Sequence, residues 1–227
     1  MLQSPPKMTT REHTQQQLIL AAEKLFAESG IDGVSLRQIN IEAGQKNSSA
    51  AHYHFGSKDA LILSIYKYRM AHVNARRITA IKELEQNHTE KDTHKLIGAI
   101  VYPIVKEIDA DESGRNYIRF MAQAMGHPQL DLAKLWQQEH SDGMAQILGL
   151  LRTALPDIPE PLFGQRFGLV FEQIVHSLAD LEKLRLSTTN TFAVDSGLFV
   201  SNLIDCVAGA MAAAISTDTR NELQRLS

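Results

Sequence analysis

Apolar residues recur along almost the whole chain with the 3.6-residue spacing of an α-helix. No stretch shows apolar and polar residues alternating strictly between Asn-Gly or Asp-Gly turns, as β-hairpins do. The pattern therefore predicts an all-α protein. The first helix should end at Gly30, because glycine tolerates the left-handed conformation that often follows a helix. Its apolar face is formed by Leu18, Ala21, Ala22, Leu25 and Phe26.

The start of this first helix stays open. Thr9 with Glu12 and Thr14 with Gln17 both fit a capping box, in which the two side chains bond each other's backbone N–H groups.

A second helix is indicated by two independent start signals. Ser35 and Gln38 fit a capping box, and Val34 and Ile39 have the spacing of a hydrophobic staple. We expect this helix to end at Gly44.

A third, short helix is expected next, capped by Asn47 or Ser48 and running to about Phe55. After Gly56 and Ser57, a long helix should begin near Asp59. We place the domain boundary inside that long helix. Residues 1–8 are expected to be a flexible tail, 9–70 a three-helix helix-turn-helix domain, and 71–227 a second helical domain.

Further along, Pro103 should kink or shorten a helix, and Gly126, Pro128 and Pro156 mark loops. Two long helices follow, each with apolar residues outside its main stripe, such as Val175 and Ala210. A second apolar face favours a homodimer built on these helices, and the alternative is burial inside the monomer. The expected interface residues are Phe167, Phe171, Ile174, Leu178, Val200, Ile204, Val207 and Met211.

Composition agrees with a globular protein. Hydrophobic residues make up 44% of the 227 and charged residues 22%, both ordinary values. Cys206 is the only cysteine, which excludes an intramolecular disulfide, and we expect it to be buried in an apolar helix face. No apolar leader precedes His13, and no uninterrupted apolar stretch reaches the ~20 residues of a membrane span. A cytoplasmic protein that does not associate with membranes is expected.

The net charge of −3 conceals an asymmetry. Residues 1–80 carry 10 Lys and Arg against 6 Asp and Glu, whereas residues 81–227 carry 13 against 20. A basic amino-terminal part and an acidic remainder indicate that only the first faces an anionic partner.

The two short helices around Gly44 have the chemistry of a DNA-reading unit. Small or hydrogen-bonding residues at positions 47–50 would let a helix approach base edges, and His52 and Tyr53 add longer donors. Arg37, Lys46 and Lys58 could bind phosphates. Ala51 and Phe55 should face inward.

These motifs resemble the amino-terminal DNA-binding domain of the tetracycline-repressor (TetR) family. The resemblance covers residues 14–67, and its most diagnostic part is the Tyr-His-Phe-Gly-Ser-Lys segment at 53–58. One residue more than the common pattern lies between Gly44 and Tyr53. The alignment of positions 45–49 with DNA is therefore the least defined part.

The resemblance implies a ligand-responsive transcriptional regulator, expected to be a repressor, that binds a palindromic double-stranded DNA operator as a homodimer. From the side-chain chemistry and the resemblance together, the residues expected to contact DNA are Ser35, Arg37, Lys46, Asn47, Ser48, Ser49, Ala50, His52, Tyr53, His54 and Lys58. The resemblance also implies an unknown small-molecule effector, and makes residues 71–227 a helical domain for effector binding and dimerisation. Candidate pocket residues, chosen for aromatic, thioether and imidazole groups, are Tyr102, Phe120, Met121, Met125, His127, Trp136 and His176.

Enzymatic and metal-binding motifs are not apparent in the sequence. It has no glycine-rich phosphate loop and no nucleophile elbow, and its closely spaced histidines lack metal-ligand spacing. We expect no catalysis, cofactor or metal. The alternative function is a helical dimeric small-molecule-binding protein whose DNA-binding domain is vestigial.

Overall fold

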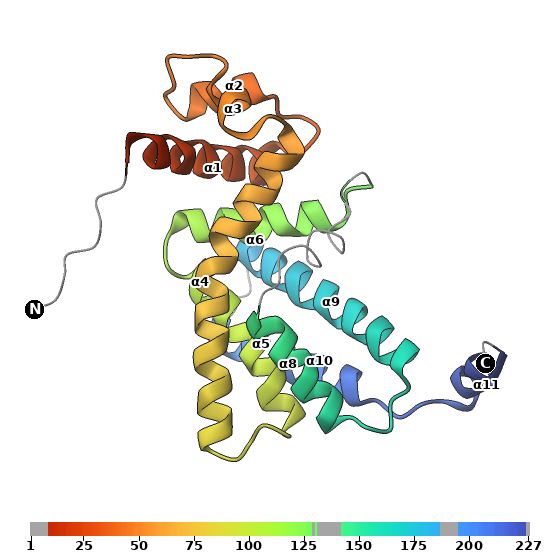
Figure 1. Cartoon of the computed structure of the whole chain (residues 1–227). Helices are drawn as coiled ribbons and strands as arrows, with labels where there is room; N and C mark the ends of the chain where they lie inside the picture. The colour runs from red at the N-terminus through yellow and green to blue at the C-terminus, as the bar shows by residue number, and fades with distance from the viewer. Residues whose placement is uncertain (1–8, 129, 131–141, 187–194, 226–227) are drawn as a thin grey trace, which may run out of the picture. The chain divides into compact units, whose positions relative to one another are not determined.

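The computed structural model describes residues 9–128, 130, 142–186 and 195–225, and every regular element among them is an α-helix (Figure 1). The all-α prediction is confirmed. The expected flexible tail at 1–8 and the candidate pocket residue Trp136 lie outside the described residues.

The described residues form two compact units. Unit 1 combines residues 9–72 with 107–130, and unit 2 combines 73–106 with 142–225. Helices α4 (Lys58–Gln86) and α5 (Thr93–Ile108) each contribute to both units. Residues 107–128, which the sequence-based boundary assigned to the second domain, pack with the amino-terminal helices.

Unit 1 contains α1 (Thr10–Ser29), α2 (Leu36–Glu42), α3 (Ala50–Phe55), the first half of α4 and α6 (Glu112–Met125). Of the two capping boxes considered for α1, the structure contains the one formed by Thr9 and Glu12. The predicted capping box of Ser35 and Gln38 at the start of α2 is confirmed.

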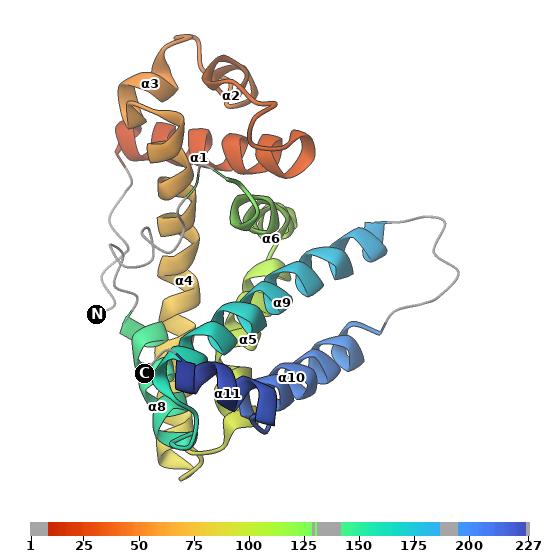
Figure 2. The same cartoon turned by 90° about the vertical axis from the view of Figure 1, so that its right-hand side faces the viewer.

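Helix α6 packs against α1 in unit 1 (Figure 2). The rings of Phe26 and Phe120 stack at 5.9 Å between centroids. At the end of α1, the carbonyl of Ala27 accepts hydrogen bonds from Arg119 (3.2 Å) and Gln123 (3.1 Å). α6 is thus part of the scaffold that supports the amino-terminal helices.

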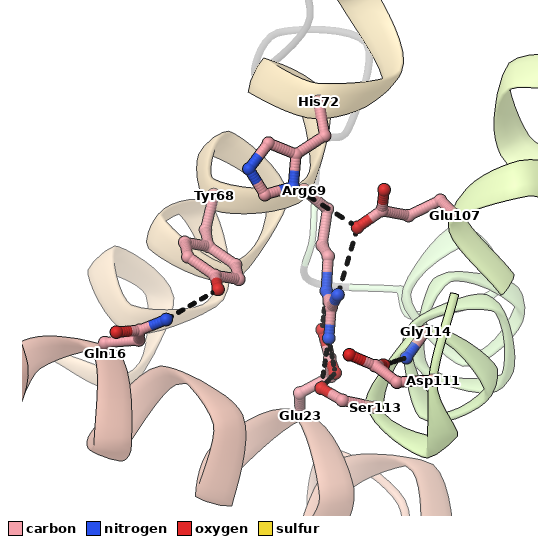
Figure 3. Close-up of polar contacts among 9 residues, drawn as sticks. All are labelled: Gln16, Glu23, Tyr68, Arg69, His72, Glu107, Asp111, Ser113 and Gly114. Atoms are coloured by element: carbon pink, nitrogen blue, oxygen red, sulfur yellow. Dashed lines mark hydrogen bonds and ion pairs between the residues drawn. The ribbon is translucent and has the colours of Figure 1, made fainter. Parts of the chain in front are cut away.

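A buried guanidinium joins three helices of unit 1 (Figure 3). Arg69 on α4 donates two hydrogen bonds to the Glu23 carboxylate on α1, from Nε (2.8 Å) and Nη2 (2.7 Å). Its Nη1 donates to Glu107 at the end of α5, at 3.0 Å. All three side chains are at least 95% buried. This cluster ties α1 and α5 to α4.

Neighbouring groups complete the Arg69 cluster. The Ser113 hydroxyl accepts a hydrogen bond from Arg69 and donates one to Glu23 at 3.1 Å. The ring of exposed His72 lies 3.5 Å from the Glu107 carboxylate. Burial raises the pKa of the Glu23 carboxyl above its ordinary value, although Arg69 and Ser113 oppose this shift.

Unit 2 contains the second half of α4, most of α5, α8 (Asp142–Ala154), α9 (Glu160–Leu186), α10 (Ser196–Ala212) and α11 (Thr217–Arg225). Helices α9 and α10 lie side by side (Figure 2). Among the described residues, no single helix is long and apolar enough to span a membrane; α10 and α11 pass that test only jointly, across a 53° bend.

The residues predicted to form a dimer interface instead lie in the protomer's own core. Seven are buried, and Phe167 is half-buried: Phe167, Phe171, Ile174, Leu178, Val200, Ile204, Val207 and Met211. The periodicity identified the apolar stripe of each helix correctly, but each stripe is already covered within the protomer. The seven buried side chains are therefore not available to a second copy.

Arg69→Met should destabilise the protein by about 3–5 kcal/mol at neutral pH, because it leaves buried carboxylates without a counter-charge. Removal of Arg69 raises the folded-state pKa of Glu23 further above its unfolded value. The lost stability should therefore return as the pH falls through that raised pKa. Urea unfolding from pH 7 to pH 4.5 measures this.

The matched control for Arg69→Met is the triple variant Arg69→Met, Glu23→Leu, Glu107→Leu. It removes the whole ionic cluster and should recover most of the stability. An Arg69→Met protein as stable as the wild type at pH 7 would contradict this account.

Candidate nucleic-acid interface

The connection between α2 and α3 differs from the predicted one. Helix α3 begins at Ala50, so the prediction that Asn47 or Ser48 caps it is wrong. The Asn47 side-chain carbonyl instead accepts a hydrogen bond from the Ser49 N–H at 2.9 Å, which closes a local turn. Asn47, Ser48 and Ser49 are all exposed on this turn.

Asn40 on α2 fixes the start of α3. Its side-chain NH₂ donates to the carbonyl of Ser48, and its side-chain carbonyl accepts from the Ala51 N–H at 2.8 Å. The N-cap residue Ser49 makes no side-chain capping bond, so Asn40 satisfies one of the free N–H groups of α3 from another helix. Asn40 is 1% exposed, and its amide makes both bonds out of contact with water.

The sequence analysis missed Asn40, although the helical periodicity held a signal. Leu36, Ile39, Asn40 and Ala43 follow the i, i+3, i+4, i+7 spacing of one helix face. A single amide on an otherwise apolar face indicates a buried polar group that requires partners.

Besides exposed Ile41 on α2, the turn and the two short helices expose a set of polar side chains, which we call the reading surface. Its members are Ser35, Arg37, Lys46, Asn47, Ser48, Ser49, His52 and Tyr53. Tyr53 is 75% exposed although it is aromatic, and it lies on α3 next to His52. The surface therefore presents cations, hydroxyls and imidazole together.

Three of the residues predicted to contact DNA are not fully exposed and do not belong to the reading surface. Ala50 is 6% exposed, so the expectation that it faces bases is corrected: it packs in the core beside fully buried Ala51. His54 is half-buried, and its Nδ1 has no hydrogen-bond partner among the described residues. Lys58 is half-buried with its Nζ 5.7 Å from the centre of the Phe26 ring, a cation–π contact.

The reading surface carries little uncompensated negative charge. Glu42 at the end of α2 accepts a 2.6 Å hydrogen bond from Lys24 on α1. The same contact raises the pKa of the Lys24 ammonium. Arg37 and Lys46 thus lie on a face suited to a polyanion.

The candidate pocket residues do not gather in one place. Phe120 and Met121 are buried in the core of unit 1, which corrects their assignment to a pocket. Met125 and His127 are half-buried in unit 1, and His127 lies 3.1 Å from Asp32. In unit 2, His176 is exposed on α9, and Tyr102 lines a groove between α4 and α5.

Two other predictions concern cysteine and metal. Cys206 is exposed on α10, so its expected burial is wrong; it lies opposite the buried stripe of that helix. Within the described ranges, His, Cys, Asp and Glu side chains form no group of three or more that could hold a metal ion.

Asn40→Leu should cost about 2 kcal/mol of unfolding free energy, because the Ser48 carbonyl and the Ala51 N–H would be left unpaired. Hydrogen exchange at Ala51 should accelerate with it. Asn40→Asp keeps an acceptor for Ala51 but offers Ser48 no donor, and should also destabilise. Asn47→Ala, which removes only an exposed hydrogen bond of the turn, is the control. If Asn40→Leu and Asn47→Ala lowered the unfolding free energy equally, the two Asn40 hydrogen bonds, which we call the Asn40 clamp, would not hold the start of α3.

Comparison with known proteins identifies the family. Residues 18–65 match the model of the tetR family of bacterial regulatory proteins, and residues 98–210 match a tetracyclin repressor-like carboxyl-terminal domain. No curated protein matches the sequence significantly.

Solved structures share the fold. A protein from Shewanella sp. PV-4 assigned to the TetR family of transcription regulators aligns with a TM-score of 0.63 at 16% identity, over 88% of this chain and 99% of its own. A second, from Mesorhizobium loti MAFF303099 and likewise assigned, aligns with a TM-score of 0.51 at 16% identity, over 91% and 98%. Since the two family models together span most of the chain, the protein belongs to the TetR family of bacterial transcription regulators.

Proposed function

We propose that this protein is a repressor that binds a palindromic operator as a homodimer and is released by a small molecule. The observation that carries the proposal is the reading surface, held by the buried Asn40 clamp within the segment that matches the tetR-family model. A vestigial domain would have no need of an exposed surface of this chemistry.

The reading surface has two roles in this proposal. Ser48, Ser49 and His52 contact base edges, because their short or planar donors can enter the major groove. Arg37, Lys46 and the Tyr53 hydroxyl bind phosphates and set the register. Helix α3 has only six residues, so part of the base recognition comes from the turn that precedes it.

The dimer is proposed to use the outward faces of α9 and α10. Leu169 and Leu198 are 68% and 71% exposed there, which is unusual for leucine. Gly168 and Gly209 lie on the same faces, and a Cβ built at either would meet no atom within 4 Å. Glycine inside a helix costs about 1 kcal/mol relative to alanine, so close approach by a second copy supplies a reason for both.

Two-fold symmetry then predicts two half-sites about 34–36 Å apart on one face of the duplex. The small molecule acts through a difference in its affinity for the DNA-bound and released states.

Arg37→Ala should weaken binding to specific and non-specific DNA alike and reduce the salt dependence by about one phosphate contact. His52→Ala should instead weaken binding to the preferred operator by about 1–3 kcal/mol and reduce the discrimination between operator and scrambled DNA. Fluorescence anisotropy on a selected operator and a scrambled duplex, at several salt concentrations, measures both. Lys82→Ala, an exposed lysine on the unit 2 part of α4, is the control. Absence of salt-sensitive, sequence-selective binding by the wild type would overturn the function.

Gly168→Arg should yield a folded monomer with much weaker operator binding, because the site is open in the protomer and closed in the proposed dimer. Gly149→Arg on α8 is the matched control, since that glycine is also exposed with no atom near its Cβ position. Sedimentation velocity reports the mass. If Gly168→Arg and Gly149→Arg sedimented alike as dimers, the interface would lie elsewhere.

A further inference from the structure

A groove of about 640 Å³ lies between the second half of α4 and α5, entirely within unit 2. Its size is within the range of small-molecule sites, about 300–1,000 Å³. Of the expected pocket residues that the structure describes, only Tyr102 lines it. The groove is therefore a site that the sequence analysis did not identify.

The lining follows the helical register of both walls. Arg76, Thr79 and Glu83 are spaced i, i+3 and i+7 on α4, and Lys95 and Lys106 lie eleven residues apart on α5. The two helices are joined by only six residues, 87–92, so they run in opposite directions. Arg76 and Lys106 consequently share one end of the groove, and Glu83 and Lys95 share the other.

The groove is richer in cations than the unit that contains it. Residues 73–106 and 141–227 hold 12 Lys and Arg against 14 Asp and Glu, whereas the described lining holds three Lys and Arg against the carboxylate of Glu83. Across the part of the chain that the structure describes, neither Lys95 nor Lys106 has an ion-pair partner for its ammonium group. A concave surface with an excess of cations attracts small anions.

The floor of the groove is apolar and shaped around one ring. Leu84, Ala99 and Pro103 are buried beneath it. The Tyr102 side chain lies against Gly98, where an added Cβ would come within 3.3 Å of its Cε2. Gly98 thus allows the aromatic ring to lie close to the helix backbone. Tyr102 remains 49% exposed, so one face can stack on a ligand.

We propose that this groove binds a small organic anion: a ring compound that carries one carboxylate or phosphate. The anionic group lies between Arg76 and Lys106, because none of the described lining residues at that end is a carboxylate, and the ring stacks on Tyr102. Thr79 and Glu83 supply hydrogen bonds to polar substituents. That this anion is the effector rests on the proposed function, whereas binding itself does not.

Isothermal titration calorimetry with four probes tests the site: 1-naphthoate, 1-naphthyl phosphate, uncharged 1-naphthalenemethanol and inorganic phosphate. At least one of the two ring anions should bind, and comparing their affinities shows whether the site prefers a carboxylate or a phosphate. The alcohol and inorganic phosphate should each bind at least about tenfold more weakly, because the alcohol lacks the anionic group and inorganic phosphate lacks the ring.

Lys106→Glu should lower the affinity for the ring anion at least about tenfold, because it reverses a charge at the end of the groove that holds the anionic group. Tyr102→Ala should lower the same affinity through loss of stacking. Lys82→Glu is the matched control, since it makes the same charge change on α4 at an exposed residue outside the groove. The proposal is overturned if neither ring anion binds, or if Lys106→Glu and Lys82→Glu weaken binding equally.

The regulatory part is tested separately, by operator anisotropy with and without the bound ring anion. A lowered operator affinity in the wild type, absent in Lys106→Glu, supports the effector role. An unchanged operator affinity overturns that role and leaves the groove as a binding site. A protein that binds the ring anion but no DNA refutes the proposed function alone.

Discussion

The scaffold of unit 1 depends on one guanidinium that serves two buried carboxylates. Taking a charge out of water is costly, so Arg69, Glu23 and Glu107 can be buried only with their geometry satisfied together. Glu23 comes from α1, Arg69 from α4 and Glu107 from the end of α5. The reading surface therefore rests on helices whose mutual positions are set by polar geometry as well as by apolar packing.

The two ends of the chain use charge in opposite ways. In unit 1 the exposed cations face outward on short elements, and the nearby acid Glu42 is paired with Lys24. In unit 2, cations collect in a groove between two helices. Exposed cations on a protein surface suit an extended polyanion, and a concave cationic groove suits a small anion with a hydrophobic part.

Local signals predicted local structure well. The capping box of α2 and the end of α1 at Gly30 follow from residues a few positions apart, so the sequence alone defines them. Pairings between distant residues were not visible: Arg69 with Glu107 is 38 positions apart, and the clamp from Asn40 to Ala51 crosses a turn. The apolar stripes of α9 and α10 were also correctly located. Periodicity shows that a face is buried but not by which chain, which is why Phe171 and Ile204 were assigned to a partner.

The origin of the α3 cap has a consequence for folding order. A six-residue helix is far below the length at which helices are stable alone, and the side chain that caps α3 belongs to α2. Helix α3 can therefore form only once α2 is in place, so the two should open and close as one cooperative unit. Helix α3 would then have no independent local folding equilibrium: the fraction of molecules in which it is formed is set by the docking of α2.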